Sequence, residues 1–315
     1  MRLVFLGYQT WGCVALRALI DAGHEVVLVI THPSSDQPYE SIWSDSVAAL
    51  AADQDIRCLT RTYANDDEVA TLVRESGAAL LVSSDWRTWL SPDIYTLVAN
   101  GAINVHDGLL PRYGGFAPLN WAVVNGEKEV GVTVHFMNDE FDLGDIVLQR
   151  RVPAGPDETA TDLFHRTLPL FAELTVEAVR QIADGTAVRT PQDPACATFF
   201  HKRSEHDSLI VWTAEPEFIC RLVRAQSVPY PSAFTFHQGR KLEVLSASLS
   251  SRPYGGTAGR VFCRVDGGVA IVAGPASWTG ANRAVVLHEV RIDQGQPLKA
   301  ADYFTRMGDY LGGGA

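Results

Sequence analysis

The chain has 315 residues, 46% of them hydrophobic and 20% charged, which is typical of a globular protein of about two domains. No apolar run approaches the roughly 18 residues that suggest a membrane span, and a strand pattern starts at the N-terminus, so we expect neither a membrane segment nor a signal peptide. The formal net charge is −11, with −13 in residues 1–205 and +2 in residues 206–315, so neither half has the basic excess typical of a nucleic-acid-binding protein. Five scattered cysteines without a CxxC pair argue against a zinc site or a disulfide framework and indicate a reducing, cytoplasmic compartment.

The chain opens with a βαβ pattern, in which strands over 2–6 and 25–30 flank a helix over 13–21. The loop between Gly7 and Gly12 lacks the central glycine of a dinucleotide fingerprint, and no GK[ST] follows it. This favours a loop that lines a ligand cleft over a nicotinamide site.

The pattern continues to about residue 190, with further elements at these positions: helices over 44–52, 66–76, 118–125 and 159–184, and strands over 56–59, 78–83, 102–106, 130–136 and 146–152. The strand over 78–83 is almost continuously apolar, as a central parallel strand should be. We therefore predict an α/β fold with a Rossmann-like, mostly parallel sheet over 1–190, followed by a proline-bearing linker over 191–205.

Residues 206–315 change character and predict a smaller C-terminal β domain, barrel-like and similar to an OB fold. After a helix over 215–225, five short strands are expected over 233–237, 241–247, 259–265, 269–273 and 284–290. We expect a last helix over 298–310 and a frayed tail over 312–314.

Three polar residues stand where loops follow apolar strands. Asn104 and His106 are two apart in a strand pattern, so their side chains share a face, and Asp142 lies in a later loop. Each alone has a structural explanation, as a loop former, a core histidine or a turn residue. Together an amide, an imidazole and a carboxylate can hold an oxyanion and move a proton. No GxSxG nucleophile pattern is present, so an acyl group would pass directly to its acceptor.

The same stretch resembles a known family. Its motif consists of Asn104-Val-His106-Asp-Gly-Leu-Leu-Pro111, then Trp121, Gly126, Gly131-Val-Thr133 and Asp142-x-Gly144. This is similar to the 10-formyltetrahydrofolate-dependent formyltransferases, which formylate methionyl-tRNA, UDP-4-amino-4-deoxyarabinose, other amino sugars and some siderophore precursors. The resemblance implies an N-formyltransferase without a metal, in which Asn104 polarises the formyl carbonyl, His106 moves the proton and Asp142 orients His106.

The resemblance also implies a folate site for 10-formyltetrahydrofolate, the formyl donor. Its pterin would lie between Thr88, Trp89 and Leu90 on one side and Asn138, Asp139, Glu140 and Phe141 on the other, with Gly108, Leu109, Leu110 and Pro111 at the formyl end. Without the resemblance, the two tryptophans that directly follow the apolar strand over 78–83 are better explained as side chains that seal a hydrophobic edge.

The acceptor side is where the sequence departs from the family. Asp107-Gly108, Gly114-Gly115 and Phe116 replace more usual residues there, and a short acidic loop replaces the basic insertion of the tRNA enzymes. The overall likeness favours N5-hydroxyornithine of siderophore biosynthesis as the small-molecule acceptor, facing Tyr8, Gln9, Thr10 and Trp11. An amino-sugar nucleotide and methionyl-tRNA are the alternative acceptors. Hydrolysis and folate binding without turnover are the alternative activities, and the sequence makes no prediction of oligomeric state.

Overall fold

A computed structural model describes residues 1–312 of the chain. Its contacts divide the chain into two units, each made of several segments. The N-terminal unit comprises Met1–Leu119, Glu129–Ala154 and Leu163–Lys202. The C-terminal unit comprises Asn120–Lys128, Gly155–Asp162 and the chain from Arg203 onward.

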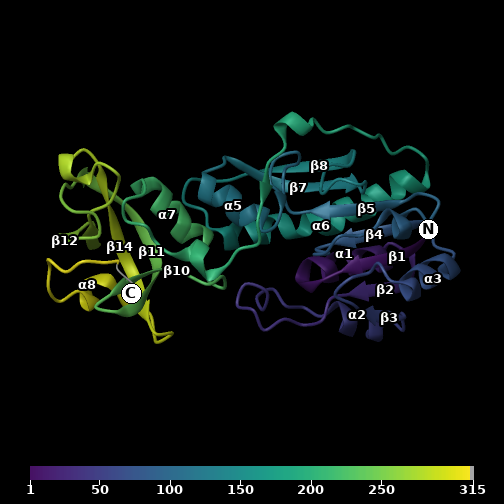
Figure 1. Cartoon of the computed structure of the whole chain (residues 1–315), viewed down its shortest axis with the longest axis horizontal. Helices are drawn as coiled ribbons and strands as arrows, with labels where there is room; N and C mark the ends of the chain where they lie inside the picture. Colours follow the sequence, from purple (N-terminus) through teal and green to yellow (C-terminus); the bar gives the residue numbers. More distant parts are fainter. Residues whose placement is uncertain (313–315) are drawn as a thin grey trace. The chain divides into compact units, whose positions relative to one another are not determined.

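The N-terminal unit is built on a seven-stranded sheet of order β3-β2-β1-β4-β5-β7-β8, whose strands follow one another from β3 at the bottom of Figure 1 to β8 at the top. Its strands are β1 (Arg2–Gly7), β2 (Glu25–Thr31), β3 (Cys58–Thr60), β4 (Leu80–Ser84), β5 (Ala102–His106), β7 (Glu129–Phe136) and β8 (Ile146–Pro153). The first five are mutually parallel, whereas β7 and β8 are antiparallel to their neighbours. This confirms the predicted mostly parallel α/β sheet.

Helices cover both faces of this sheet because its central strands are apolar on both sides. One core cluster lies against α1 (Gln9–Asp21), α2 (Val47–Asp53) and α6 (Ala160–Ala183), and the other lies against α3 (Asp67–Ser76) and α4 (Pro92–Tyr95). Alternate residues of each strand enter alternate clusters: Phe5 faces α1 and α6, and Leu6 faces α3. The sheet alternation therefore tells which face a polar residue occupies at a strand's end.

Local signals explain where the helices begin and end. The Asp66 side chain accepts from the Val69 amide at the start of α3, and Gly77 adopts a left-handed conformation at its end. Ser46 caps α2 in the same way, through the Ala49 amide. One helix on each face of the sheet therefore begins at a polar residue whose side chain caps it.

The order of strands creates a crevice at the carboxyl edge of the sheet. From β1 the chain proceeds outward to β2 and β3, then returns to β4 on the other side of β1. Ligand sites in open α/β sheets form at such a reversal, outside the carboxyl ends of the strands. The loops after β1, β4 and β5 lie at this edge.

Short segments complete this unit near the predicted linker. Strand β6 (Gly114–Gly115) pairs in parallel with β9 (Phe199–Phe200), and a 3₁₀ turn, η1, spans Pro194–Cys196. Helix α5 (Pro118–Asn125) follows β6 and runs into the C-terminal unit.

The C-terminal unit contains a six-stranded antiparallel sheet with the order β10-β11-β14-β13-β12 and β15 beside β14. Its elements are α7 (Pro216–Ala225), β10 (Ala233–His237), β11 (Arg240–Pro253), β12 (Val261–Val265), β13 (Gly268–Ile271), β14 (Arg283–Ile292), β15 (Leu298–Lys299) and α8 (Ala300–Tyr303), with 3₁₀ turns η2 (Glu205–Ser208) and η3 (Ser277–Thr279). Tyr310 bridges to Arg260 and Leu311 to His237, so the last residues join the two edges of the sheet. This confirms the predicted smaller β domain.

The predicted terminal helix over 298–310 is wrong in extent. Only α8 is helical there, and Lys299 before it pairs with Glu289 of β14. The Gly308 amide donates to the Val261 carbonyl, so this backbone bonds to a strand instead of continuing a helix. The predicted frayed tail is also wrong at Gly312, whose amide donates to the Phe236 carbonyl; residues 313–314 lie outside the described residues. No helix in the described part of the chain has the length and hydropathy of a membrane span.

Candidate active site

The structure brings the three predicted catalytic residues together. Asn104 and His106 project from β5 to the α3 face, and Asp142 approaches from the loop after β7. The His106 Nδ1 atom lies 3.8 Å from Asp142 Oδ2, and both side chains are at least nine-tenths buried. The His106 Nε2 atom donates to the Tyr113 carbonyl oxygen at 2.8 Å, since a carbonyl can only accept. Each ring nitrogen of His106 thus faces an oxygen atom of the protein.

His135 of β7 is a fourth member that the sequence analysis missed. It pairs with Asn104 across the β5–β7 ladder, and its Nε2 atom lies 3.4 Å from Asn104 Nδ2 and 3.5 Å from Asp142 Oδ1. Alternation along 130–136 puts it on the same face as Thr133, which is the signal that could have identified it. The His135 ring therefore lies between the Asn104 amide and the Asp142 carboxylate.

The amide of Asn104 has a fixed orientation. Its Oδ1 atom accepts from the Ser83 hydroxyl at 2.9 Å, which leaves Nδ2 directed toward His135. An amide NH₂ has two protons, so one remains to polarise a carbonyl oxygen bound beside it.

Asp142 is a buried carboxylate that stays ionised. Burial alone raises its pKa, but the charges and hydrogen bonds of His106, His135 and the Gly115 amide outweigh burial and lower the pKa to about 2. The Gly115 amide donates to Asp142 Oδ2 at 2.9 Å. Asp142 sits at φ 56°, in the left-handed region, and the Gln192 amide nitrogen donates to its carbonyl oxygen at 2.8 Å. The site therefore maintains a negative charge beside His106.

The loop after β5 is fixed by the neighbouring strands. Thr133 donates to the Gly108 carbonyl at 2.6 Å, and Gln149 donates to the Leu110 carbonyl at 2.9 Å. A Cβ atom at Gly108 would lie 2.9 Å from His106 Nε2, so only glycine lets this loop pass so close to the imidazole.

A cavity adjoins this set on the α3 face. It is lined by Asn104, His135 and Asp142 together with Trp86, Thr88, Trp89, Leu90, Met137, Asn138, Glu140 and Phe141. Six predicted folate contacts thus surround one cavity: Thr88, Trp89, Leu90, Asn138, Glu140 and Phe141. The lining also includes Trp86 and Met137, which were not among the predicted folate contacts.

The remaining predicted folate contacts lie outside this lining. Asp139 accepts from the Tyr95 hydroxyl at 2.7 Å, and Gly108, Leu109, Leu110 and Pro111 form the fixed loop after β5. The indole N–H of Trp86 is buried in the lining without a hydrogen-bond partner, which is a donor that a pterin could satisfy. The residues present therefore fit a folate.

The cavity has a volume of about 50 Å³, below the ~300 Å³ common for small-molecule sites. Trp89 and Phe141 in its lining are each 41% exposed. Two of the side chains that line the cavity are therefore accessible to solvent.

Three of the four predicted acceptor-binding residues already form hydrogen bonds within the protein. The Tyr8 hydroxyl donates to the Pro33 carbonyl, and the Thr10 hydroxyl donates to the Trp43 carbonyl. Gln9 accepts from Arg87 at 2.7 Å and donates to the Glu40 carbonyl. Trp11 differs, because its indole N–H is buried without a hydrogen-bond partner.

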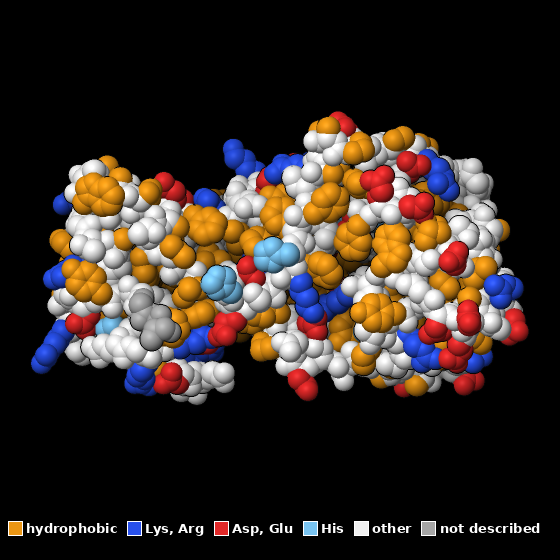
Figure 2. All heavy atoms as spheres, in the orientation of Figure 1, with side chains coloured by type: hydrophobic (Ala, Val, Ile, Leu, Met, Phe, Trp, Pro, Cys, Tyr) orange, Lys and Arg blue, Asp and Glu red, His pale blue; other side chains and the backbone are white. Residues whose placement is uncertain are grey.

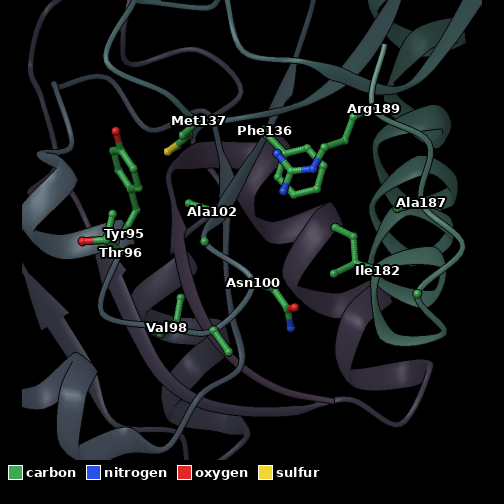
Figure 3. Close-up of a pocket in the computed structure, with 13 residues that line it drawn as sticks. Tyr95, Thr96, Val98, Asn100, Ala102, Phe136, Met137, Ile182, Ala187 and Arg189 are labelled. Atoms are coloured by element: carbon green, nitrogen blue, oxygen red, sulfur yellow. The ribbon is translucent and has the colours of Figure 1, made fainter. Parts of the chain in front are cut away.

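A second cavity, of about 480 Å³, lies at the opposite end of β5 (Figure 3). Its lining includes Tyr95, Asn100, Phe136 and Arg189, and the Arg189 guanidinium lies 3.5 Å from the Phe136 ring centre. It contains none of the catalytic set. Among the described residues no cluster of metal-ligating side chains is found.

A mostly parallel α/β sheet that brings an amide, an imidazole and an ionised carboxylate together beside one cavity is suited to a protein of the acyl-transfer class. Comparison with known families makes this specific. Residues 1–179 match the formyl transferase domain, and residues 202–308 match the formyl transferase C-terminal domain. The chain belongs to the formyl transferase family.

Solved structures share this fold at low sequence identity. WlaRD, a sugar 3N-formyl transferase solved with dTDP and 5-N-formyl-THF, has a TM-score of 0.66 and 17% identity, over 94% of this chain and 99% of that one. The N-formyltransferase from Helicobacter canadensis, solved with folinic acid and dTDP-3-aminofucose, gives 0.67 and 17%, over 90% and 98%. HypX from Aquifex aeolicus, in complex with tetrahydrofolic acid, gives 0.57 and 17%, over 97% of this chain and 47% of its own.

Proposed function

We propose that this protein transfers a formyl group from 10-formyltetrahydrofolate to an amino nitrogen of a small molecule, and that the acceptor is an amino sugar linked to a nucleotide. The observation that carries the transfer is the convergence of Asn104, His106 and Asp142 beside the α3-face cavity. The folate supplies the formyl group when bound.

The chain's own residues have complementary tasks in this proposal. The Asn104 NH₂ donates to the carbonyl oxygen as negative charge develops on it. His106 receives the proton that the attacking nitrogen releases and passes it on, and Asp142 stabilises the charged imidazole from 3.8 Å. Burial of His106 and Asp142 strengthens the interaction between them.

The choice of acceptor follows from the relatives. Two of the solved relatives match over at least 90% of both chains: one is named a sugar 3N-formyl transferase, and the other is an N-formyltransferase bound to dTDP-3-aminofucose. N5-hydroxyornithine, the acceptor expected from the sequence, has no specific support from them. A tRNA acceptor is also disfavoured, because acidic and basic side chains are interspersed on the face drawn in Figure 2.

The experiment is a tetrahydrofolate-release assay. The protein is mixed with 10-formyltetrahydrofolate alone and with dTDP-3-aminofucose, N5-hydroxyornithine or methionyl-tRNA, and the formylated product is identified by mass. We expect release that depends on the amino sugar. Release without an acceptor would instead indicate a hydrolase, and folate binding without release under any condition would indicate a binding module.

A further inference from the structure

Three buried polar atoms without hydrogen bonds lie at the carboxyl edge of the sheet. They are Ser84 Oγ after β4, Asp107 Oδ1 after β5 and Trp11 Nε1 at the start of α1. Ser84 is fully buried. Unsatisfied buried polar atoms are costly and are expected where a ligand completes their hydrogen bonds.

These atoms share one face of the sheet. Val82 and Val105 pack in the core beneath α1 and α6, so alternation directs Ser84 and Asp107 to that face as well. Ser84 pairs with Val105 in the β4–β5 register. Asn104 and His106 point to the opposite face, toward the predicted folate cavity. Asp107 follows His106 directly in the chain, and the polar groups around it on the α1 face form a second compartment next to β5.

The charges around this compartment do not balance. Arg87 pairs with Asp85 at 3.0 Å and with Glu40 at 3.5 Å, and Lys202 also pairs with Glu40. Two cations thus match two carboxylates. Asp107 is the remaining carboxylate, and among the described residues no cation pairs with it. The compartment is one positive charge short.

The electrostatics of Asp107 reflect the absence of a cation beside it among the described residues. Burial, and after it the negative charge of Asp85, raise the pKa of Asp107 well above its ordinary value. The nearby Trp11 indole lowers the pKa only partly and makes no hydrogen bond of ordinary geometry. A cationic ligand would reverse this destabilisation.

We propose that Asp107 binds the amino group of the acceptor as an ammonium ion and so selects amines over otherwise identical alcohols. This inference rests on the proposed function and names the residue that recognises its acceptor. The ammonium supplies the missing positive charge, and the Trp11 N–H donates to an adjacent acceptor oxygen. One ammonium proton then moves to the Asp107 carboxylate: an N–H bond breaks, its electron pair stays on nitrogen, and an O–H bond forms. A neutral amine with a free electron pair results.

The test compares two ligands that differ only in this group. Calorimetry measures the binding of dTDP-3-aminofucose and dTDP-fucose to the folinic-acid-loaded protein, and tetrahydrofolate release measures KM and kcat. The parent should prefer the amine by about tenfold or more, as expected for a hydrogen-bonded charge. Asp107→Asn keeps the size and the acceptor oxygen, and its preference should fall to within about threefold, with the change in KM exceeding that in kcat. Trp11→Phe keeps an aromatic side chain but removes the indole N–H, and it should weaken the binding of both ligands equally.

Asp184→Asn, an exposed aspartate just after α6, is the matched control and should behave as the parent. Folinic-acid binding and thermal unfolding establish that each variant is folded. An Asp107→Asn protein that formylates the amino sugar with unchanged preference would overturn the inference while leaving the proposed function standing. A parent that binds neither sugar would overturn the proposed function itself.

Discussion

The imidazole Nε2 of His106 donates to the backbone carbonyl of Tyr113, while its Nδ1 faces the carboxylate of Asp142. The first contact places the proton of the neutral imidazole on Nε2, because a carbonyl oxygen can only accept. The two contacts together fix the tautomer and the orientation of the ring, with Nδ1 facing the carboxylate.

Replacing His106 by asparagine should remove proton transfer without disturbing folate binding. We expect kcat to fall by roughly 10³-fold, the middle of the range for general acid–base catalysis. Folinic-acid affinity, measured by tryptophan fluorescence, should stay within about twofold because His106 is not in the cavity lining. His24→Asn, at a half-buried position beside the N-terminus, is the control. Full activity in the His106 variant would remove this residue from the mechanism.

Gly108→Ala should act through His106. Its Cβ would lie 2.9 Å from His106 Nε2 and 3.1 Å from Pro118 Cβ, so the imidazole or the loop must shift. A displacement near 1 Å can cost about 10²-fold in rate, and we expect this loss in kcat with folate affinity unchanged. Gly155→Ala is the matched control, since its nearest neighbour is the flexible end of Glu158. Equal rates for the two variants would contradict the proposed fit.

Asp142→Asn should reduce stability in a pH-dependent way. The folded pKa of about 2 lies below the ordinary 3.8, so the ionised carboxylate stabilises the folded state above about pH 4. This contribution is lost as the pH falls through the folded pKa. The shift corresponds to about 2 kcal/mol. Urea unfolding at pH 7 should show that difference from the parent, and the difference should shrink below pH 4. A constant difference from pH 7 to pH 3 would refute the assignment.

Tyr95→Phe should loosen the loop of residues 138–142. Burial, and then its hydrogen bond to Asp139, raise the pKa of Tyr95 to about 12, so it is a neutral donor at physiological pH. Loss of this bond should weaken folinic-acid binding by about 1 kcal/mol, or roughly fivefold, with kcat unchanged. Thr96→Val, which removes the neighbouring hydroxyl (Figure 3), is the control. If both variants bind folinic acid equally well, Tyr95 does not order the loop.

The sequence predicted the sheet, and it placed Asn104 and His106 on a common face, because both rest on local signals. Apolar runs identified β1, β4 and β5, and the spacing of Asn104 and His106 fixed their common face. His135 was missed because its role depends on register with Asn104 across two strands that are distant in sequence. The internal hydrogen bonds of Tyr8, Gln9 and Thr10 depend on tertiary contacts with residues 33–43, which no local pattern reveals.

The prediction of a terminal helix was wrong for a related reason. The run 298–310 has a helical pattern, but its backbone groups find partners at β12 and β14, and these tertiary bonds outweigh local propensity. The unbalanced charge of Asp107 was equally invisible, because it depends on which carboxylates Arg87 and Lys202 reach.

The stretch between Pro191 and Lys202 has a practical consequence for anyone dividing this protein. Gln192 bonds to the backbone at Asp142 and Gly144, β9 extends β6, and Lys202 neutralises Glu40. A fragment that stops at residue 190 would retain every side chain proposed to be catalytic yet lose the contacts that hold their loops. The smallest excisable catalytic piece therefore reaches at least to Lys202.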